Sequence, residues 1–112
     1  MPIPQHKLAG TVTQATSKST GVQLDRLAGQ ITMHAASLAA TTSVSFTLTN
    51  NKIGANDVVD ACIASGATAN SYYLMVDAVA NGSCRIQLRN VTGGALAEAV
   101  VINFGVIKVR RG

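Results

Sequence analysis

An apolar run near the C-terminus restricts the fold of this chain more than any other segment. It covers residues 98–108, with a charged residue at each end and Asn103 as the only polar side chain between them. In an extended strand its apolar residues fall on both sides of the pleat, with Val100, Ile102, Phe104 and Val106 on one side and Val101 and Ile107 on the other. Such a strand needs cover on both faces. We therefore expect a central strand, about ten residues long at ~3.3 Å per residue, that crosses a whole small domain.

Shorter segments of alternating apolar and polar residues precede this run, and turns containing Gly or Asn separate them. The clearest is residues 42–50, where Val44, Phe46 and Leu48 alternate with Ser and Thr. Residues 29–34, 58–64 and 71–79 show the same pattern less regularly. Together they predict about eight short strands and no long helix. This pattern is typical of an all-β protein, either a single antiparallel β-sandwich or a jelly-roll-like barrel.

The length of the chain, 112 residues, is that of one domain with a single core. Residues 1–9 contain Pro2 and Pro4 and show no periodicity, so we expect an extended N-terminal arm. Residues 10–112 then form the β-sandwich domain. Lys108, Arg110 and Arg111 give this domain a short basic C-terminal end.

The register of one hairpin can be predicted from its apolar residues. A two-residue Asn81-Gly82 loop would place Asp77 opposite Ile86, whereas a three-residue loop, residues 80–82 with Gly82 left-handed, matches apolar with apolar residues. The second register pairs Leu74 with Leu88, Val76 with Ile86, Ala78 with Cys84, and Asp77 with Arg85. Cys84 then faces the core and Cys62 does not, so we expect two free thiols.

The low charge of the chain indicates a surface that can be covered. Charged residues make up 12% of the sequence, against about 25% in an ordinary soluble protein. The polar surface is therefore mostly Ser, Thr, Asn and Gln, which lose their hydration at lower cost than Lys or Glu. Two interpretations are open: a subunit that works inside an assembly, or a Thr-rich β domain that happens to carry little charge.

Several classes of partner are not expected. The net charge is +4, but aromatic residues are only 4% and Trp is absent, so no stacking platform for nucleic acid is indicated and we expect no specific nucleic-acid binding. No apolar segment reaches the ~18 residues of a membrane span. No signal-peptide core follows Met1, so we expect synthesis in the cytoplasm and no membrane association.

We also expect no enzymatic activity, no metal, no cofactor and no small-molecule substrate. The acidic residues and the two histidines, His6 and His34, are dispersed, and neither histidine has a His or Cys at metal-ligand spacing. The sequence contains no G-x-S-x-G elbow, no phosphate-binding G-x-x-x-x-G-K and no dinucleotide fingerprint. No residue is assigned a catalytic role.

The candidate functional residues are therefore partner-binding residues in three places. They are Pro2, Ile3 and Pro4 in the arm; Tyr73, Met75, Arg85 and Arg89 on the outer side of the predicted hairpin; and Lys108, Arg110 and Arg111 at the C-terminal end. Tyr, Met and Arg are the residue types that protein interfaces favour. The alternative for the hairpin is an ordinary solvated face whose ion pair contributes less than about 1 kcal/mol.

Five phrases of the sequence carry a family resemblance: residues 10–22, 29–33, 42–50, 82–90 and 97–108. They look like segments of small structural proteins encoded by tailed bacteriophages and prophages, and the likeness runs over nearly all of the chain after residue 9. Within that group, a single β domain of this size is similar to capsid decoration (cement) proteins. The resemblance implies a homo-oligomer, a dimer or a trimer, that binds the major capsid protein on the outer surface of the head. It assigns no functional residue.

The resulting expectation is a virion protein, made in the bacterial host cytoplasm, that stabilises the capsid without catalysis. The alternative is a receptor- or glycan-binding knob of a phage head or tail fibre, for which only Tyr72 and Tyr73 could supply an aromatic surface. A host regulator that binds nucleic acid would need a coherent basic face. Arg85 and Arg89 instead share theirs with Asp77.

Overall fold

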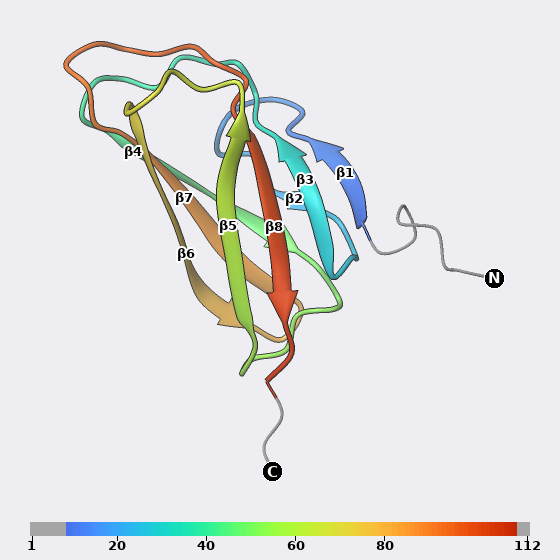
Figure 1. The fold of residues 1–112 in the computed structure, drawn as a ribbon. Helices are drawn as coiled ribbons and strands as arrows, with labels where there is room; N and C mark the ends of the chain where they lie inside the picture. The colour runs from blue at the N-terminus through green and yellow to red at the C-terminus, as the bar shows by residue number, and fades with distance from the viewer. Residues whose placement is uncertain (1–8, 110–112) are drawn as a thin grey trace.

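The computed structural model describes residues 9–109 and shows two β-sheets packed face to face (Figure 1). Sheet A has the strand order β1-β3-β8-β5 and sheet B the order β2-β4-β7-β6. The prediction of an all-β domain of about eight strands is confirmed, and no helix occurs in the described part of the chain. The strands are β1 (Ala9–Thr13), β2 (Val22–Gln23), β3 (Ala28–Thr32), β4 (Ser43–Thr49), β5 (Val58–Ser65), β6 (Tyr72–Ala80), β7 (Ser83–Asn90) and β8 (Val101–Ile107).

The core fills the space between the two sheets with one side of each strand. Ile31, Leu48, Ile86, Leu88 and Ile102 have no exposed surface. Fully burying a side chain of this kind contributes roughly 1.5–3 kcal/mol. The alternation read from the sequence is the cause of this core, because every second residue of a strand points to the same side.

The predicted central position of the C-terminal run is confirmed, because β8 lies between β3 and β5 in sheet A. The predicted cover of both its faces is wrong. Val100, Ile102 and Phe104 are buried in the core, but Ile107 on the opposite side is 52% exposed. Asn103 is also exposed on that side, so the outer face of sheet A is polar enough to meet water.

Both sheets are mixed rather than purely antiparallel. β1 pairs in parallel with β3, and β2 pairs in parallel with β4. These pairs arise because the first four strands alternate between sheets A and B. After a strand in one sheet, the chain forms a strand in the other sheet and then returns to the first sheet in its original direction. The intervening strand thus serves as the crossover connection that parallel strands require.

The predicted register of the β6–β7 hairpin is confirmed along its apolar residues. Leu74 pairs with Leu88 and Val76 with Ile86. Gly82 is left-handed, with φ +85°, as expected. The pairing shifts by one residue near the turn because of a bulge between Asp77 and Ala80, where Ala78 has φ +51°. The predicted pairing of Ala78 with Cys84 and the predicted three-residue loop over residues 80–82 are therefore wrong. Ala80 pairs with Ser83 instead, so the loop consists of Asn81 and Gly82 only.

Only one residue of the predicted arm, residues 1–9, lies among the described residues. Ala9, placed at the end of the arm, is the first residue of β1 and pairs with Ala28. Residues 1–8, which form the rest of the predicted arm, lie outside the described residues.

Candidate functional site

The outer face of sheet B collects four of the predicted partner-binding residues. We call this surface face B and define it by the outward residues of three adjacent strands: Ser43, Ser45 and Thr47 of β4, Arg85, Gln87 and Arg89 of β7, and Tyr73, Met75 and Asp77 of β6. The pairing places them in three rows across the sheet. The rows are Ser43, Arg89 and Tyr73; Ser45, Gln87 and Met75; and Thr47, Arg85 and Asp77.

The charges of face B are largely compensated. Arg85 donates from Nε and Nη2 to the two carboxylate oxygens of Asp77, at 2.8 and 2.6 Å. This bidentate pair lowers the pKa of Asp77, mainly through the hydrogen bonds from Arg85, and raises the pKa of Arg85. Arg89 donates from Nη1 to Ser43 Oγ at 3.3 Å. Face B therefore carries one uncompensated charge, that of Arg89.

Two large side chains on face B stand open to solvent. Tyr73 is 71% exposed and Met75 is 53% exposed, although both belong to a strand whose neighbouring residues pack into the core. Tyr72 points the other way, is buried, and donates from its hydroxyl to Glu98 Oε1 at 2.8 Å. Only Tyr73 of this tyrosine pair is thus available to a partner.

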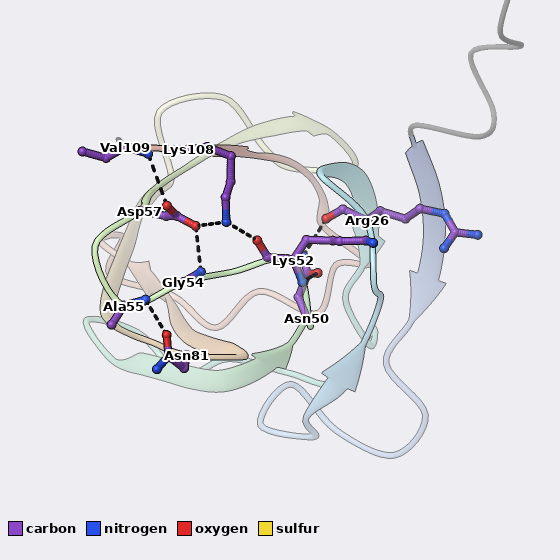
Figure 2. Close-up of polar contacts among 9 residues, drawn as sticks. All are labelled: Arg26, Asn50, Lys52, Gly54, Ala55, Asp57, Asn81, Lys108 and Val109. Atoms are coloured by element: carbon purple, nitrogen blue, oxygen red, sulfur yellow. Dashed lines mark hydrogen bonds and ion pairs between the residues drawn. The ribbon is translucent and has the colours of Figure 1, made fainter. Parts of the chain in front are cut away.

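Lys108, predicted as part of a basic binding end, is part of a polar cluster that ties the residues just after β8 to the β4–β5 loop (Figure 2). Its Nζ donates to Asp57 Oδ2 at 2.6 Å and to the carbonyl oxygen of Lys52 at 3.0 Å. Asp57 also accepts from the backbone N–H groups of Gly54, at 2.7 Å, and Val109, at 3.3 Å. The hydrogen bond from Lys108 is the main reason why the pKa of Asp57 is lowered.

Two asparagines complete the connections at this end of the sandwich, as Figure 2 shows. Asn50, which is fully buried, donates from Nδ2 to the carbonyl oxygen of Arg26 at 2.7 Å. Asn81 accepts from the backbone N–H of Ala55 at 2.9 Å. The ammonium group of Lys108 thus closes a structural end cap. Pro2, Ile3, Pro4, Arg110 and Arg111, the other predicted partner-binding residues, lie outside the described residues.

A second polar cluster was not predicted from the sequence. Lys18 is 3% exposed, and its Nζ donates to the carbonyl oxygens of His34 and Glu98. Burial lowers the pKa of Lys18, and the charge of Glu98 opposes this effect. Glu98 accepts from Tyr72 and from the backbone and hydroxyl of Thr68, and these hydrogen bonds lower its pKa, with the one from Tyr72 contributing most. The cluster therefore joins four loops that are distant in sequence, those between β1 and β2, β3 and β4, β5 and β6, and β7 and β8.

The two cysteines of the chain lie apart and form no disulfide. Cys62 is exposed and Cys84 is buried, and both are free thiols, as predicted. Burial, with a smaller contribution from Asp77, raises the pKa of the Cys84 thiol to about 11, so it is protonated at neutral pH.

Among residues 9–109, no three His, Cys, Asp or Glu side chains lie close enough together to hold a metal ion. A search of these residues for a helix able to cross a membrane finds none.

Comparisons of the chain with models of protein families, with curated proteins and with solved structures found no match. The chemistry of the surface is therefore the basis for assigning a function. Face B offers hydrogen-bonding Ser, Thr and Gln side chains around Tyr73 and Met75, with little net charge. Tyr and Met are residue types that protein interfaces favour.

Proposed function

We propose that this chain is a structural protein of a bacteriophage virion: a capsid decoration, or cement, protein that binds the outer surface of the major capsid lattice and stabilises the head. In this proposal it is made in the bacterial host cytoplasm, assembles as a small homo-oligomer and ends on the capsid surface. It neither catalyses a reaction nor binds a cofactor. The likeness of its strand phrases to structural proteins of tailed phages supports the proposal.

The observation that carries the proposal is the exposure of Tyr73 and Met75 on face B, 71% and 53%. Both are residue types that interfaces favour, and they stand on β6, the edge strand of sheet B, which pairs along one side with β7. Covering them with another protein would remove apolar surface from water. The Ser and Thr residues beside them would lose their hydration at little cost.

A capsid also explains why moderate contacts suffice. A decoration protein binds many equivalent sites on one closed shell, and an oligomer that engages two or more of them gains avidity without stronger single contacts. In this proposal the arm, with Pro2, Ile3 and Pro4, and the C-terminal Arg110 and Arg111 add contacts at the edges of each subunit. Lys108 contributes through the end cap, in which its ammonium group is already bound to the β4–β5 loop.

The test is binding of the purified protein to expanded capsids assembled from the major capsid protein of the same phage genome. We expect a fixed ratio of decoration protein to capsomers and a higher melting temperature of the capsids. Y73S should weaken binding at least about tenfold, because truncation of a central interface aromatic commonly costs more than 1.4 kcal/mol. I107S is the matched control, since Ile107 is also exposed, by 52%, but lies on the outer face of sheet A.

The alternative function, a receptor- or glycan-binding knob, is favoured by one observation, the exposed ring of Tyr73 beside Arg89. Binding to host cells or glycans together with no binding to capsids would replace the decoration proposal with this one. Deletion of residues 1–7 separately tests the arm. Capsid binding should fall by more than the melting temperature of the protein, and an equal loss of both would contradict a binding role for the arm.

A further inference from the structure

Sheet A ends at an edge whose backbone groups have no partner within the described chain. β1 is the outermost strand, and only β3 pairs with it (Figure 1). The backbone N–H of Gln14, just after β1, donates to the carbonyl oxygen of Thr32 at 2.9 Å, toward β3. Because backbone groups alternate sides along a strand, those of Gly10 and Val12 also point toward β3. The N–H and C=O groups of Ala9, Thr11 and Thr13 therefore point away from the sheet.

The other three edges of the two sheets carry features that discourage pairing with another chain. β2 is only two residues long. β5 contains Asp60 and a bulge between Ile63 and Ser65. β6 contains Asp77 and a bulge at Ala78. Short length, charge and bulges are the usual means by which proteins protect sheet edges.

β1 has none of these features along its five residues, Ala-Gly-Thr-Val-Thr. Its pairing with β3 runs from Ala9 to Thr13 without a shift of register. Of the edges in the described part of the chain, this regular, uncharged strand is the one whose backbone can accept a further strand as it stands. Thr11 and Thr13 have exposed side chains. Both are β-branched residues, which fit a pleated sheet, so they are compatible with a further strand paired to the free edge of β1.

We propose that β1 pairs antiparallel with β1 of a second copy of this chain, with the two-fold axis at Thr11. Thr11 then faces Thr11 of the second copy, and Ala9 faces Thr13 at both ends of the pair. All three outward-pointing residues would form hydrogen-bonded pairs, so the N–H and C=O groups of each would find a partner. Sheet A would become continuous across the dimer, and no like charges would meet at the axis.

The residues that precede β1 fit the same arrangement. A pair of five-residue strands is a small contact compared with the ~1,200–2,000 Å² of a stable interface, so the strands alone would give a weak dimer. In an antiparallel pair, the chain before Ala9 leads past Thr13 of the second copy toward its Gln14. Residues 1–8 contain Ile3 and Leu8, which can add apolar contact there. The second copy is thus the occupant that uses both the edge and the segment before it.

Charge exchange at Thr11 tests this pairing in the purified full-length protein, independently of any capsid role. Sedimentation velocity of the wild type over ~1 μM to 1 mM should show a monomer–dimer equilibrium, the upper limit being the affinity of a weak association. T11K and T11E should each weaken the dimer at least tenfold at low salt, because like charges then face each other across the axis. An equimolar mixture of the two variants should associate again as a mixed dimer.

Two controls separate the edge from the rest of the surface. T49K and T49E change an exposed Thr at the end of β4, in sheet B and outside face B, and should leave the dimer unchanged. Circular dichroism verifies that all four variants fold. A wild type that is monomeric up to 1 mM or trimeric, or a T11K/T11E mixture that associates no better than either variant alone, would overturn the proposed pairing. Deletion of residues 1–8 should weaken the dimer, and an unchanged affinity would refute the contribution of that segment.

Discussion

Replacement of Asn90 by Asp should make the stability of this protein depend on pH with a sign opposite to that of its native carboxylates. Asn90 is fully buried at the end of β7. Its Nδ2 donates to the carbonyl oxygens of Leu38 at 3.0 Å and Gly94 at 2.9 Å. Its Oδ1 accepts from the backbone and hydroxyl of Thr92, at 2.9 and 2.8 Å. N90D keeps the shape and the acceptor, but it places an oxygen against two carbonyl oxygens.

The magnitude follows from the two protonation states. A protonated carboxyl group can donate to one of the two carbonyl oxygens, so the variant loses one buried hydrogen bond, about 1–2 kcal/mol. An ionised group can donate to neither, and burial beside two carbonyl oxygens should raise its pKa by roughly three units, which is equivalent to about 4 kcal/mol. The total near pH 7 is about 5–6 kcal/mol, a large part of the 5–15 kcal/mol that stabilises a typical domain.

Because the folded-state pKa of the introduced group lies above its unfolded value, the variant is closest to the wild type at low pH and falls behind it as the pH rises toward 7. Urea unfolding followed by circular dichroism at pH 4.5 and pH 7 measures this difference. N81D is the matched control: Asn81 is exposed, and its Oδ1, which accepts from Ala55, is an oxygen in either residue. The reasoning is refuted if N90D loses the same stability at both pH values or if N81D behaves in the same way.

Three further predictions follow from single contacts. The pKa of Glu98 is lowered in the folded protein, chiefly by the hydrogen bond from the Tyr72 hydroxyl. The stabilising effect of Glu98 should therefore be complete above about pH 4.5 and disappear as the pH falls through the lowered pKa. Measuring the urea midpoint of unfolding at a series of acidic pH values tests this, and the E98Q variant should lack the dependence. G66A should destabilise the protein by at least about 1 kcal/mol, because Gly66 has φ +76° and a Cβ there would collide with the carbonyl oxygen of Ala99. G93A is the control: no atom lies near the added Cβ, so the urea midpoint of unfolding should change little. Cys62 should react with a thiol reagent in the native protein at neutral pH, whereas Cys84, buried and with its pKa raised to about 11, should react only on unfolding; equal rates for the two would contradict the described packing.

Local pattern was sufficient to predict the elements whose partners are near in sequence. The β6–β7 register followed from matching Leu74 with Leu88 and Val76 with Ile86, because a slip by one residue would turn the whole apolar set outward. The outward side of this hairpin, with Tyr73 and Met75, was predicted by the same alternation. The bulge at Ala78 was not predicted, since nothing in its residue type indicates a left-handed backbone.

Features that join distant segments could not be predicted in this way. The parallel pairs β1–β3 and β2–β4 depend on which sheet each strand enters, and alternation does not contain that information. Lys18 reads as an ordinary charge in a Ser/Thr loop, yet its ammonium group binds the carbonyl oxygen of Glu98, 80 positions later. The binding of Lys108 to Asp57 is similar, 51 positions apart. In each case the sequence shows the charge but not the partner.

The place of β8 between β3 and β5 has a consequence for the order of folding during translation. β1, β3 and β5 are synthesised before β8, but until residues 101–107 follow, β3 can pair only with β1 and β5 has no partner in sheet A. The β6–β7 hairpin and β4 can associate earlier, because their partners are already present. Sheet A can thus be completed only after β8 has been synthesised, which would delay any self-association that depends on a finished sheet A.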